Sequence, residues 1–379
     1  MPGGCLFLGT TMSTLHFLEP TPNQRHLYPF TLLREAIDLP LGLFTLREKW
    51  SALFYAAYPK KKLTGTISAA ILPDIKLCQA IGSLRKGQSL FSKDGRWIAA
   101  SVVVDRIPKK ATAGDIIFQG SISEIIYPWD LLDQLSRGIE LDFTMLTKGR
   151  KSASLPKSVI VNGKYPVFLE KDARVMPSFL NTEAGPIYVG KEAEVQEGAM
   201  IRGPFLLGER SVVKMGAKIY GPTAAGNNCL LGGEIKRSLL FPFSNKAHEG
   251  YMGDSVIGSW CNWGAGTSNS NLKNTAGDIQ IEVEGESRSV GQKAGVFMGD
   301  HSRTVINSSL NSGTVIGVSV QVGNEGLPPK RISSFRWMDG SRYRFEAALK
   351  HIRQWKALKK QALTSEEINR LKKIFKTDK

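Results

Sequence analysis

An aliphatic residue recurs at every sixth position through the middle of the chain, and this period constrains the fold more than any other feature. The unbroken set comprises Val189, Val195, Ile201, Leu207, Val213, Ile219, Ala225 and Leu231. The period returns at Met298, Thr304, Leu310, Ile316 and Val322. A helix repeats near 3.6 residues and a flat strand near 2, so neither element alone accounts for a period of six. A chain that turns a corner after each short strand does, which is the hexapeptide signature of a parallel β-helix.

The sequence on either side of this repeat predicts two further regions. Residues 1–150 alternate strand-like runs (14–18, 97–104) with helical patterns (within 37–58, and from 129), which indicates an α/β layer domain. A Ser/Lys-rich join at 149–156 precedes the β-helix, called the coil below, which we place at 157–325. We expect a helical cap, or an oligomer contact, at 341–379, where Thr364 and Glu367 form a capping box.

The repeat is interrupted twice, at roughly 236–252 and 269–296. Insertions in a coil of this kind leave the stack as loops, often on the binding face. We therefore expect two excursions. The second contains a charged stretch at 279–288 that alternates like a solvated hairpin strand.

The charge and the cysteine content narrow the class of protein. The formal net charge is +16, and half of this excess lies in residues 341–379. No nucleic-acid motif or stacking set of aromatic residues accompanies it, so phosphorylated metabolites are the better partners for this positive potential. Four scattered cysteines, without a Cys-x-x-Cys pair, favour neither a zinc site nor a disulfide framework and suit a reducing cytoplasm. We expect no membrane span and no signal peptide.

The segment 234–271 contains the richest set of chemical groups. It reads EIKRSLLFPFSNKAHEGYMGDSVIGSWCNWGAGTSNSN. His248 could act as a general base, because the pKa of histidine lies near neutral pH. The glycine-rich turn that follows could bring backbone N–H groups to a developing oxyanion. Residue types alone nevertheless favour an ordinary loop histidine and glycines that only shape corners.

The same segment resembles, without gaps, the acetyltransferase domain of the bifunctional N-acetylglucosamine-1-phosphate uridyltransferase/glucosamine-1-phosphate acetyltransferase family, known as GlmU. Over residues 28 to about 335 the chain is more similar still to a variant branch of sugar nucleotidyltransferases. The runs PFTLLREAIDLPLGLFTLREKW, VKMGAKIYG, SNKAH, VIGSWCNWGAGTSNSNLKN and MGDHS recur there in the same order.

The resemblance implies roles for particular residues. His248 would be the catalytic base that takes a proton from the amine of glucosamine-1-phosphate. Substrate contacts would come from Lys236, Tyr251 and Asn262, and contacts to acetyl-CoA from Ala265 and Asn271. The resemblance also implies a left-handed β-helix that assembles as a homotrimer with sites shared between subunits.

One position departs from the family pattern in this half of the chain. Asp300 takes the place of a family serine that contacts the cofactor, and a carboxylate suits an anionic cofactor poorly. Asp300 and the adjacent His301 are equally consistent with an exposed corner pair. A carbonic-anhydrase-like zinc site is not expected, because only His248 and His301 lie in the coil and no His-x4-His pair exists.

The N-terminal half carries a weaker form of the resemblance. Sugar nucleotidyltransferases open with a Gly-x-Gly-Thr-Arg loop that cradles a triphosphate, followed by Pro-Lys. Here Gly3, Gly4 and Gly9 precede the first expected strand, and Glu35-Ala36 takes the place of Pro-Lys. The basic residues Arg25, Arg34, Arg47 and Lys49 could still bind phosphates, and Asp74 is a poor candidate for Mg²⁺. Each of these charges is also consistent with an ordinary surface helix or turn.

The sequence therefore predicts a nucleotidyltransferase-like α/β domain, a left-handed parallel β-helix and C-terminal helices. The function we expect is a transferase of sugar-nucleotide biosynthesis, with acetyl transfer from acetyl-CoA to an amino-sugar 1-phosphate and nucleotidyl transfer giving UDP-N-acetylglucosamine. Nucleotidyl transfer alone, with the coil as an assembly scaffold, stays open. So does a non-catalytic scaffold that binds sugar nucleotides.

Overall fold

The computed structural model describes residues 14–19, 25–59, 64–283, 285–323, 326–337 and 339–378. The glycines of the N-terminal stretch, Gly3, Gly4 and Gly9, lie outside these residues. The chain forms two compact units. The first comprises residues 1–24, 35–40 and 44–126, and the second comprises 25–34, 41–43 and 127–379. Each unit is described by itself.

The first unit is the α/β layer that the sequence predicts. Its five-stranded sheet has the order β1-β2-β4-β3-β5. The strands are β1 (Thr14–Leu18), β2 (Thr64–Ser68), β3 (Ser89–Ser92), β4 (Trp97–Ala100) and β5 (Ile116–Phe118). Helix α1 (Leu46–Ala57) begins with a Thr45/Glu48 capping box, and the indole N–H of Trp50 donates to the carbonyl of Ile71 at 3.1 Å. This bond and the burial of Trp50 fix α1 against the chain that follows β2.

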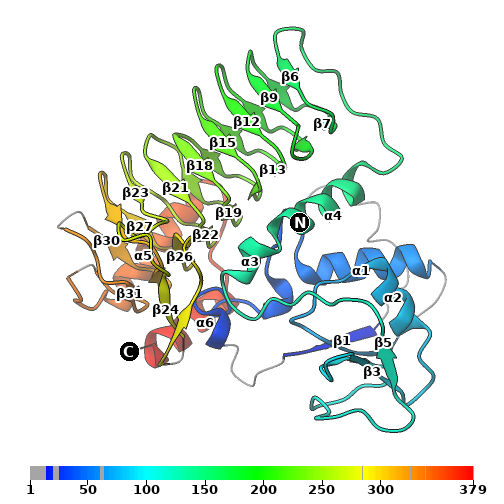
Figure 1. The fold of residues 1–379 in the computed structure, drawn as a ribbon. Coiled ribbons are helices and arrows are strands. Elements are labelled where there is room, and N and C mark those ends of the chain that lie inside the picture. Colours follow the sequence, from blue (N-terminus) through cyan, green and yellow to red (C-terminus); the bar gives the residue numbers. More distant parts are fainter. Residues whose placement is uncertain are drawn as a thin grey trace. The chain divides into compact units, whose positions relative to one another are not determined.

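The second unit is built on a parallel β-helix whose strands form three faces (Figure 1). The first face comprises β7 (Val167–Leu169), β10 (Ile187–Val189), β13 (Phe205–Leu207), β16 (Thr223–Ala225), β19 (Leu239–Leu240), β22 (Val256–Ile257), β26 (Val296–Met298), β29 (Thr314–Ile316) and β31 (Arg331–Ile332). The second face comprises β8 (Arg174–Val175), β11 (Glu194–Val195), β14 (Val212–Val213), β17 (Leu230–Leu231), β20 (Asn245–Lys246), β27 (Arg303–Thr304) and β30 (Gln321–Val322). The third face comprises β6 (Ile160–Asn162), β9 (Phe179–Asn181), β12 (Met200–Arg202), β15 (Lys218–Tyr220), β18 (Glu234–Lys236), β21 (Tyr251–Gly253), β23 (Ser268–Asn269) and β28 (Ser309–Leu310).

The six-residue period has the physical cause that we inferred. Equivalent residues on successive rungs pair in register, as Phe205 does with Thr223 eighteen positions later. Each rung therefore holds three strands and three corners, and one residue in six points inward. The periodic residues form a continuous buried core from Leu169 to Ile332. This confirms the predicted parallel β-helix.

Two corners of the coil hold the candidate residues His248, Ala265 and Asp300. The first corner joins the first face to the second, and a residue with a positive φ angle occupies it on successive rungs. These residues are Asp172, Glu192, Arg210, Asn228, Phe243, Trp260, His301, Ser319 and Phe335. The second corner joins the second face to the third and contains Gly198, Gly216 and, on later rungs, His248 and Ala265. Stacking of the rungs thus aligns residues that are far apart in the sequence.

The structure corrects one of the two expected interruptions. Residues 236–252 do not leave the coil, because they contain β19, β20 and the start of β21, each paired with the rung before. The rung is only shortened, since Ala224 pairs with Leu239 fifteen residues later. Residues 269–296 do depart, and they carry the antiparallel hairpin of β24 (Gln280–Val283) and β25 (Glu286–Ser289). The charged alternation at 279–288 is thereby confirmed as a hairpin.

The predicted boundary at residue 150 also differs from the structure. Helices α3 (Asp130–Asp133) and α4 (Leu135–Thr147) belong to the unit that contains the coil, and α4 packs on β13 and β16. From β7 to β29, the outward-pointing residue of each strand on the first face is apolar and buried, whereas Arg331 on β31 is exposed. This column includes Tyr188, Leu206, Ala224, Leu239, Val256 and Phe297. An apolar outer face must be covered, and α4 covers part of it.

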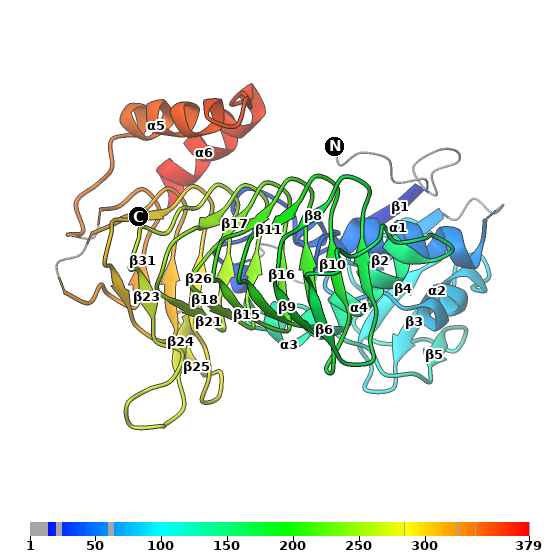
Figure 2. The same ribbon diagram turned by 90° about the horizontal axis from the view of Figure 1, so that it is seen from above.

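The C-terminal tail forms the predicted helical pair, α5 (Phe345–Ala357) and α6 (Ser365–Thr377), the latter with the Thr364/Glu367 capping box. Its position differs from that of a cap across the open end. The helices bury apolar residues against Val318 and Phe335 at the first corner, alongside the last rungs (Figure 2). In the part of the chain that the structure describes, no helix is both long and apolar enough to cross a bilayer.

Candidate functional site

His248 lies at the second corner of the coil, between β20 and β21, and its side chain is exposed. It is therefore not on a flap that leaves the scaffold, as the expected excursion at 236–252 would require. The corner is held from inside by Lys246, whose Nζ donates to the carbonyl oxygens of His248 at 2.6 Å and of Gly232 at 3.3 Å. The imidazole is thus presented to solvent from a rigid backbone position.

Lys246 occupies an inward position of the core. It pairs with Leu231 on the preceding rung, and its residue is only 1% exposed. Burial lowers the pKa of Lys246 from 10.5 to about 8, because the interior disfavours the ammonium form. Sequence reasoning did not select this residue, although a lysine at a position that is otherwise aliphatic is the signal that could have found it.

Tyr251 and Asn271 form a polar group on the third face, close in sequence to His248. The amide of Asn271 donates to the hydroxyl of Tyr251 at 3.0 Å and to the carboxylate of Asp254 at 2.5 Å. Asp254 is 2% exposed and also pairs with Arg237 at 2.8 Å. Burial, together with the nearby charge of Asp254, raises the pKa of Tyr251 to about 12. The tyrosine is therefore held in its neutral form, able to donate a hydrogen bond.

Lys236 lies on the same face, on the strand next to Tyr251. Its Cα pairs with that of Gly253 in β21. A Cβ added at Gly253 would meet the Tyr251 hydroxyl at 2.2 Å, so this glycine leaves room for the tyrosine side chain. Lys236 is half-buried, and its ammonium has no hydrogen-bond or ion-pair partner within the described residues. It is thus a cation available to an anionic ligand on this face.

Asn262 and Ala265 lie one rung further along the coil. Asn262 bridges Asn245 and Arg303 on the second face, and its side-chain oxygen accepts from Asn245 at 3.5 Å. Ala265 lies at the second corner, where its carbonyl accepts from the N–H of Asn307 at 2.7 Å. The predicted residues of the coil, apart from Asp300, thus lie at the second corner and on the two faces that meet there. They are His248 and Ala265 at the corner, Asn262 on the second face, and Lys236, Tyr251 and Asn271 on the third face.

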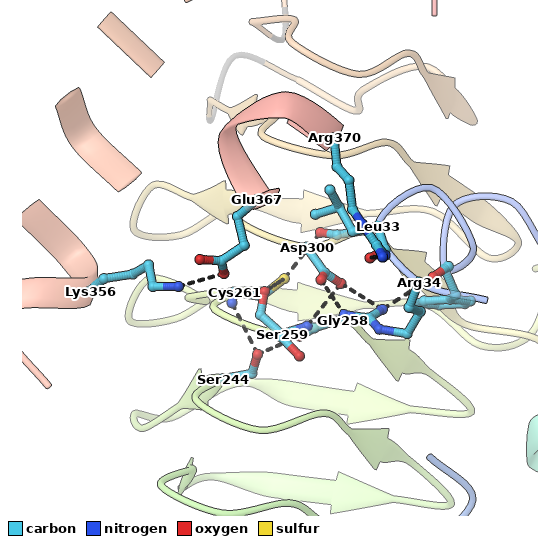
Figure 3. A network of polar contacts seen from close by, with 12 residues as sticks. Leu33, Arg34, Ser244, Gly258, Ser259, Cys261, Asp300, Lys356, Glu367 and Arg370 are labelled. Atoms are coloured by element: carbon cyan, nitrogen blue, oxygen red, sulfur yellow. Dashed lines mark hydrogen bonds and ion pairs between the residues drawn. The ribbon is translucent and has the colours of Figure 1, made fainter. Parts of the chain in front are cut away.

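Asp300 does not lie with this group, and the expectation that it contacts a cofactor is not supported by its surroundings. It lies at the first corner, is 4% exposed, and its carboxylate accepts from the guanidinium of Arg34 in a bidentate ion pair (Figure 3). The N–H of Ser259 donates to the same carboxylate at 3.1 Å. A ligand would reach Asp300 only after this pair opens. The neighbouring His301 is buried too, not exposed.

The N-terminal candidates are mostly engaged within the protein. Arg34 is held by Asp300, and Arg47 pairs with Asp38 at 2.6 Å and Glu35 at 2.9 Å, which raises the pKa of its guanidinium. Lys49 lies fully buried on α1. The side chain of Arg25 lies outside the part of the chain that the structure describes.

Asp74, the candidate for Mg²⁺, has a structural role in the fold. It is the N-cap of α2 (Ile75–Gly82), and its carboxylate accepts from the N–H of Leu77 at 2.8 Å. Within residues 14–378, apart from the undescribed gaps, no group of three or more His, Cys, Asp or Glu side chains is arranged to hold a metal ion. The donors present do not by themselves define a Mg²⁺ site.

Comparison with known proteins adds three partial matches. Residues 18–151 match a family model described as sugar nucleotidyl transferase. A bifunctional sugar-1-phosphate nucleotidylyltransferase/acetyltransferase of Sulfurisphaera tokodaii is 38% identical over 90 residues, covering 24% of this chain and 22% of that protein. The bifunctional protein GlmU of Methanocaldococcus jannaschii is 31% identical over 101 residues, covering 27% and 25%. These matches confirm the predicted resemblance over the stretches they cover.

The chain spans about a quarter of the length of these curated relatives. Among solved structures, the polysialic acid O-acetyltransferase OatWY matches with 14% identity and a TM-score of 0.28, covering 47% of this chain and 83% of that chain.

Proposed function

We propose that this protein is a transferase of sugar-nucleotide biosynthesis that transfers an acetyl group to the amine of an amino-sugar 1-phosphate, with His248 as the general base. The observation that carries the proposal is the position of His248, which is exposed at a coil corner whose backbone is anchored by the buried Lys246. A base on a rigid corner can be held at a fixed distance from a bound amine, which is the main requirement for proton transfer.

The proposed step begins with the neutral imidazole of His248 accepting a proton from the amine. The amine nitrogen attacks the carbonyl carbon of the acetyl thioester, so a C–N bond forms and the C–S bond breaks. The thiolate of coenzyme A leaves and takes up a proton. No group in this step needs a metal ion or a change of oxidation state.

Binding of the acceptor rests on Lys236, Tyr251 and Asn262. Lys236 supplies a cation for the phosphate, and the neutral hydroxyl of Tyr251 and the amide of Asn262 supply hydrogen bonds to the sugar. Ala265 and Asn271 would meet acetyl-CoA. Asn271 also orders Tyr251 through their 3.0 Å hydrogen bond, so its loss would affect both substrates.

The proposal includes a homotrimer in the cytoplasm. One coil offers its reactive residues on an exposed edge and on two faces that diverge from it, so the coil by itself does not enclose them. A neighbouring coil against this edge would form the second wall of a crevice and exclude water from the reaction.

Nucleotidyl transfer is a second candidate, favoured by the match of residues 18–151 to the sugar nucleotidyl transferase model. The engaged state of Arg34 and Arg47 argues against these two side chains as free phosphate ligands. We therefore propose this activity as an accompaniment to acyl transfer, with Mg²⁺ carried in by the nucleotide.

The decisive experiment is mass-spectrometric turnover of the full chain with glucosamine-1-phosphate, acetyl-CoA, UTP and Mg²⁺. We expect acetylated sugar phosphate from the wild type and from Glu249→Gln, a matched control at the exposed residue next to the base. His248→Gln should lower the rate by about 100-fold or more.

An unchanged rate in His248→Gln would refute the assigned base. Pyrophosphate release without any response to acetyl-CoA would leave only the nucleotidyl transferase. Absence of turnover, with sugar-nucleotide binding retained, would reject both activities in favour of a non-catalytic scaffold.

A further inference from the structure

Four buried polar atoms at the first corner of the last rungs lack a hydrogen-bond partner in the described part of the chain. They are Nδ1 of His301, Nε and Nη2 of Arg303, and Oγ of Ser319. The three residues are 3%, 7% and 1% exposed. Buried polar groups in folded proteins nearly always have a partner, so this concentration requires a chemical reason.

The backbone holds the three residues close together. His301 and Ser319 occupy the first corner on consecutive rungs, both with a positive φ angle, and the N–H of Ser319 donates to the carbonyl of Asp300 at 2.9 Å. Arg303 follows His301 by two residues at the start of β27, and its Nη1 donates to the carbonyl of His301 at 2.9 Å. The unpartnered atoms therefore belong to one small region between two rungs.

Helix α5 closes this region from the side. The guanidinium of Arg303 lies over the ring of Trp355, with 4.6 Å from its Cζ to the ring centre. The ammonium of the adjacent Lys356 lies 5.3 Å from the centre of the Trp260 ring. The site is thus formed by the corner of the coil on one side and by two consecutive residues of α5 on the other.

The free edge of Arg303 has a defined chemistry. Because Nη1 is already bonded to a carbonyl, the edge formed by Nε–H and Nη2–H is the buried one that lacks a hydrogen-bond partner. These two N–H groups are parallel in a guanidinium and bind the two oxygens of a carboxylate or phosphate side by side. The hydroxyl of Ser319 and a ring nitrogen of His301 would add two further hydrogen-bonding groups.

The charges around Arg303 also favour binding of an anion. Arg34 pairs with Asp300 and Lys356 with Glu367 at 2.5 Å, as Figure 3 shows, whereas Arg303 has no carboxylate partner within the described residues. A buried charge without a counter-ion is strongly unfavourable. Burial lowers the pKa of Arg303 to about 10. Burial and the charges of Arg303, Lys356 and Arg34 lower the pKa of His301, which keeps its ring neutral.

We propose that a small oxyanion of the size of inorganic phosphate binds between the first corner of the coil and α5, held side-on by Arg303 and capped by the hydroxyl of Ser319. The anion neutralises the guanidinium, satisfies the four atoms and ties the C-terminal helices to the last rungs. The anion site differs from the proposed acetyl-transfer site, whose base His248 lies at the second corner, although the backbones of Asn262 and Arg303 pair on the second face between them.

The test uses the full chain, dialysed into a buffer free of phosphate and sulfate and kept at constant ionic strength with sodium chloride. The midpoint of thermal unfolding is measured as inorganic phosphate replaces chloride. A ligand that binds only the folded state raises this midpoint with the logarithm of its concentration once the site is saturated. We expect such a rise in the wild type, and anion chromatography of the denatured protein should detect any oxyanion carried through purification.

Two variants and one control locate the site. Arg303→Met removes the fork and its unpaired charge, so it should fold in phosphate-free buffer but lose the response to phosphate. Ser319→Ala, a smaller change, should shift the response to higher phosphate concentrations. Arg342→Met is the control, because Arg342 also lies over an aromatic ring, Phe375, but on the exposed side of the tail, and its response should match the wild type.

An equal phosphate response in Ser319→Ala, Arg303→Met and the wild type would place the anion elsewhere and overturn the proposal. A wild type that neither responds to phosphate nor carries an oxyanion would overturn it as well. A rise that sodium chloride alone reproduces would reject the assignment of an oxyanion.

Discussion

The ion pair between Arg34 and Asp300 joins residues that are 266 positions apart, and breaking it provides the sharpest test of how the second unit is held together. Replacing Arg34 with Met removes the guanidinium but keeps an apolar chain over the ring of Phe241, on which Arg34 now lies at 5.2 Å. The substitution leaves the carboxylate of Asp300 buried without its counter-ion. The segment 25–34 should then detach more readily from the coil.

The magnitude follows from the exposure of the two side chains. The Asp300 side chain is 5% exposed and that of Arg34 is 18% exposed, and breaking a buried pair on one side typically costs 3–5 kcal/mol. The N–H of Ser259 still donates to the carboxylate at 3.1 Å, so we expect the low end, about 3 kcal/mol. Asp300→Asn should cost about 2 kcal/mol, because Arg34 can turn partly toward water. The double variant should cost less than the sum by about 2 kcal/mol.

The assay is urea unfolding of the four proteins, combined with hydrogen exchange of the backbone over residues 25–34. Arg47→Met serves as a matched control, because Arg47 pairs with Asp38 where both side chains are more than a third exposed. Its cost should stay below about 1 kcal/mol. Additive costs within about 0.5 kcal/mol, or an Arg34→Met variant as stable as the control, would refute the reasoning.

Three further outcomes can be measured on purified variants. Between pH 8 and 10.5, Lys246 should bind fewer protons in the folded state than in the unfolded chain. The free energy of unfolding of the wild type, relative to that of Lys246→Met, should therefore rise with pH across this range in urea titrations. A difference that does not change with pH would contradict the buried ammonium. Ile235→Ala in the fully buried core should cost about 3 kcal/mol, whereas Met215→Ala, at a residue 67% exposed, should stay within about 0.5 kcal/mol. Asp74→Ala should lower the free energy of unfolding by about 1 kcal/mol, because it removes the N-cap of α2. It should leave any Mg²⁺ dependence of turnover unchanged. A changed dependence would support Asp74 as a metal ligand.

The coil and the C-terminal helices could be predicted from the sequence because their signals are local and repeated. Most inward positions, one residue in six, are apolar, so the period identifies the coil on either side of the shortened rung from Ala224 to Leu239, where the period itself breaks. The capping box of Thr364 and Glu367 satisfies backbone groups within one helical turn. The position of His248 at a corner did not follow from this period, because the break predicted that residues 236–252 leave the coil, whereas β20 and β21 pair within it.

The covering of the coil could not be predicted in this way. The outward column that includes Tyr188, Leu206 and Phe297 is apolar, which indicates that this face is not solvated. The sequence of the column does not identify the segment that covers it. Only the tertiary structure assigns part of that face to α4 and joins the segment 25–34 to the first corner. Long-range pairs leave no periodic trace in the sequence.

The same limit applies to the charged candidates. The sequence proposed Arg34 as a phosphate ligand from its charge and Asp300 as a cofactor contact from the resemblance, because a sequence shows a charge without its partner. Folding paired them with each other and left Arg303 as a buried cation without a carboxylate partner in the part of the chain that is described. The sequence determined the repeating backbone, since each rung depends on its own six-residue pattern. The tertiary structure alone decided which charges are free to bind, because that depends on which partners folding brings into contact.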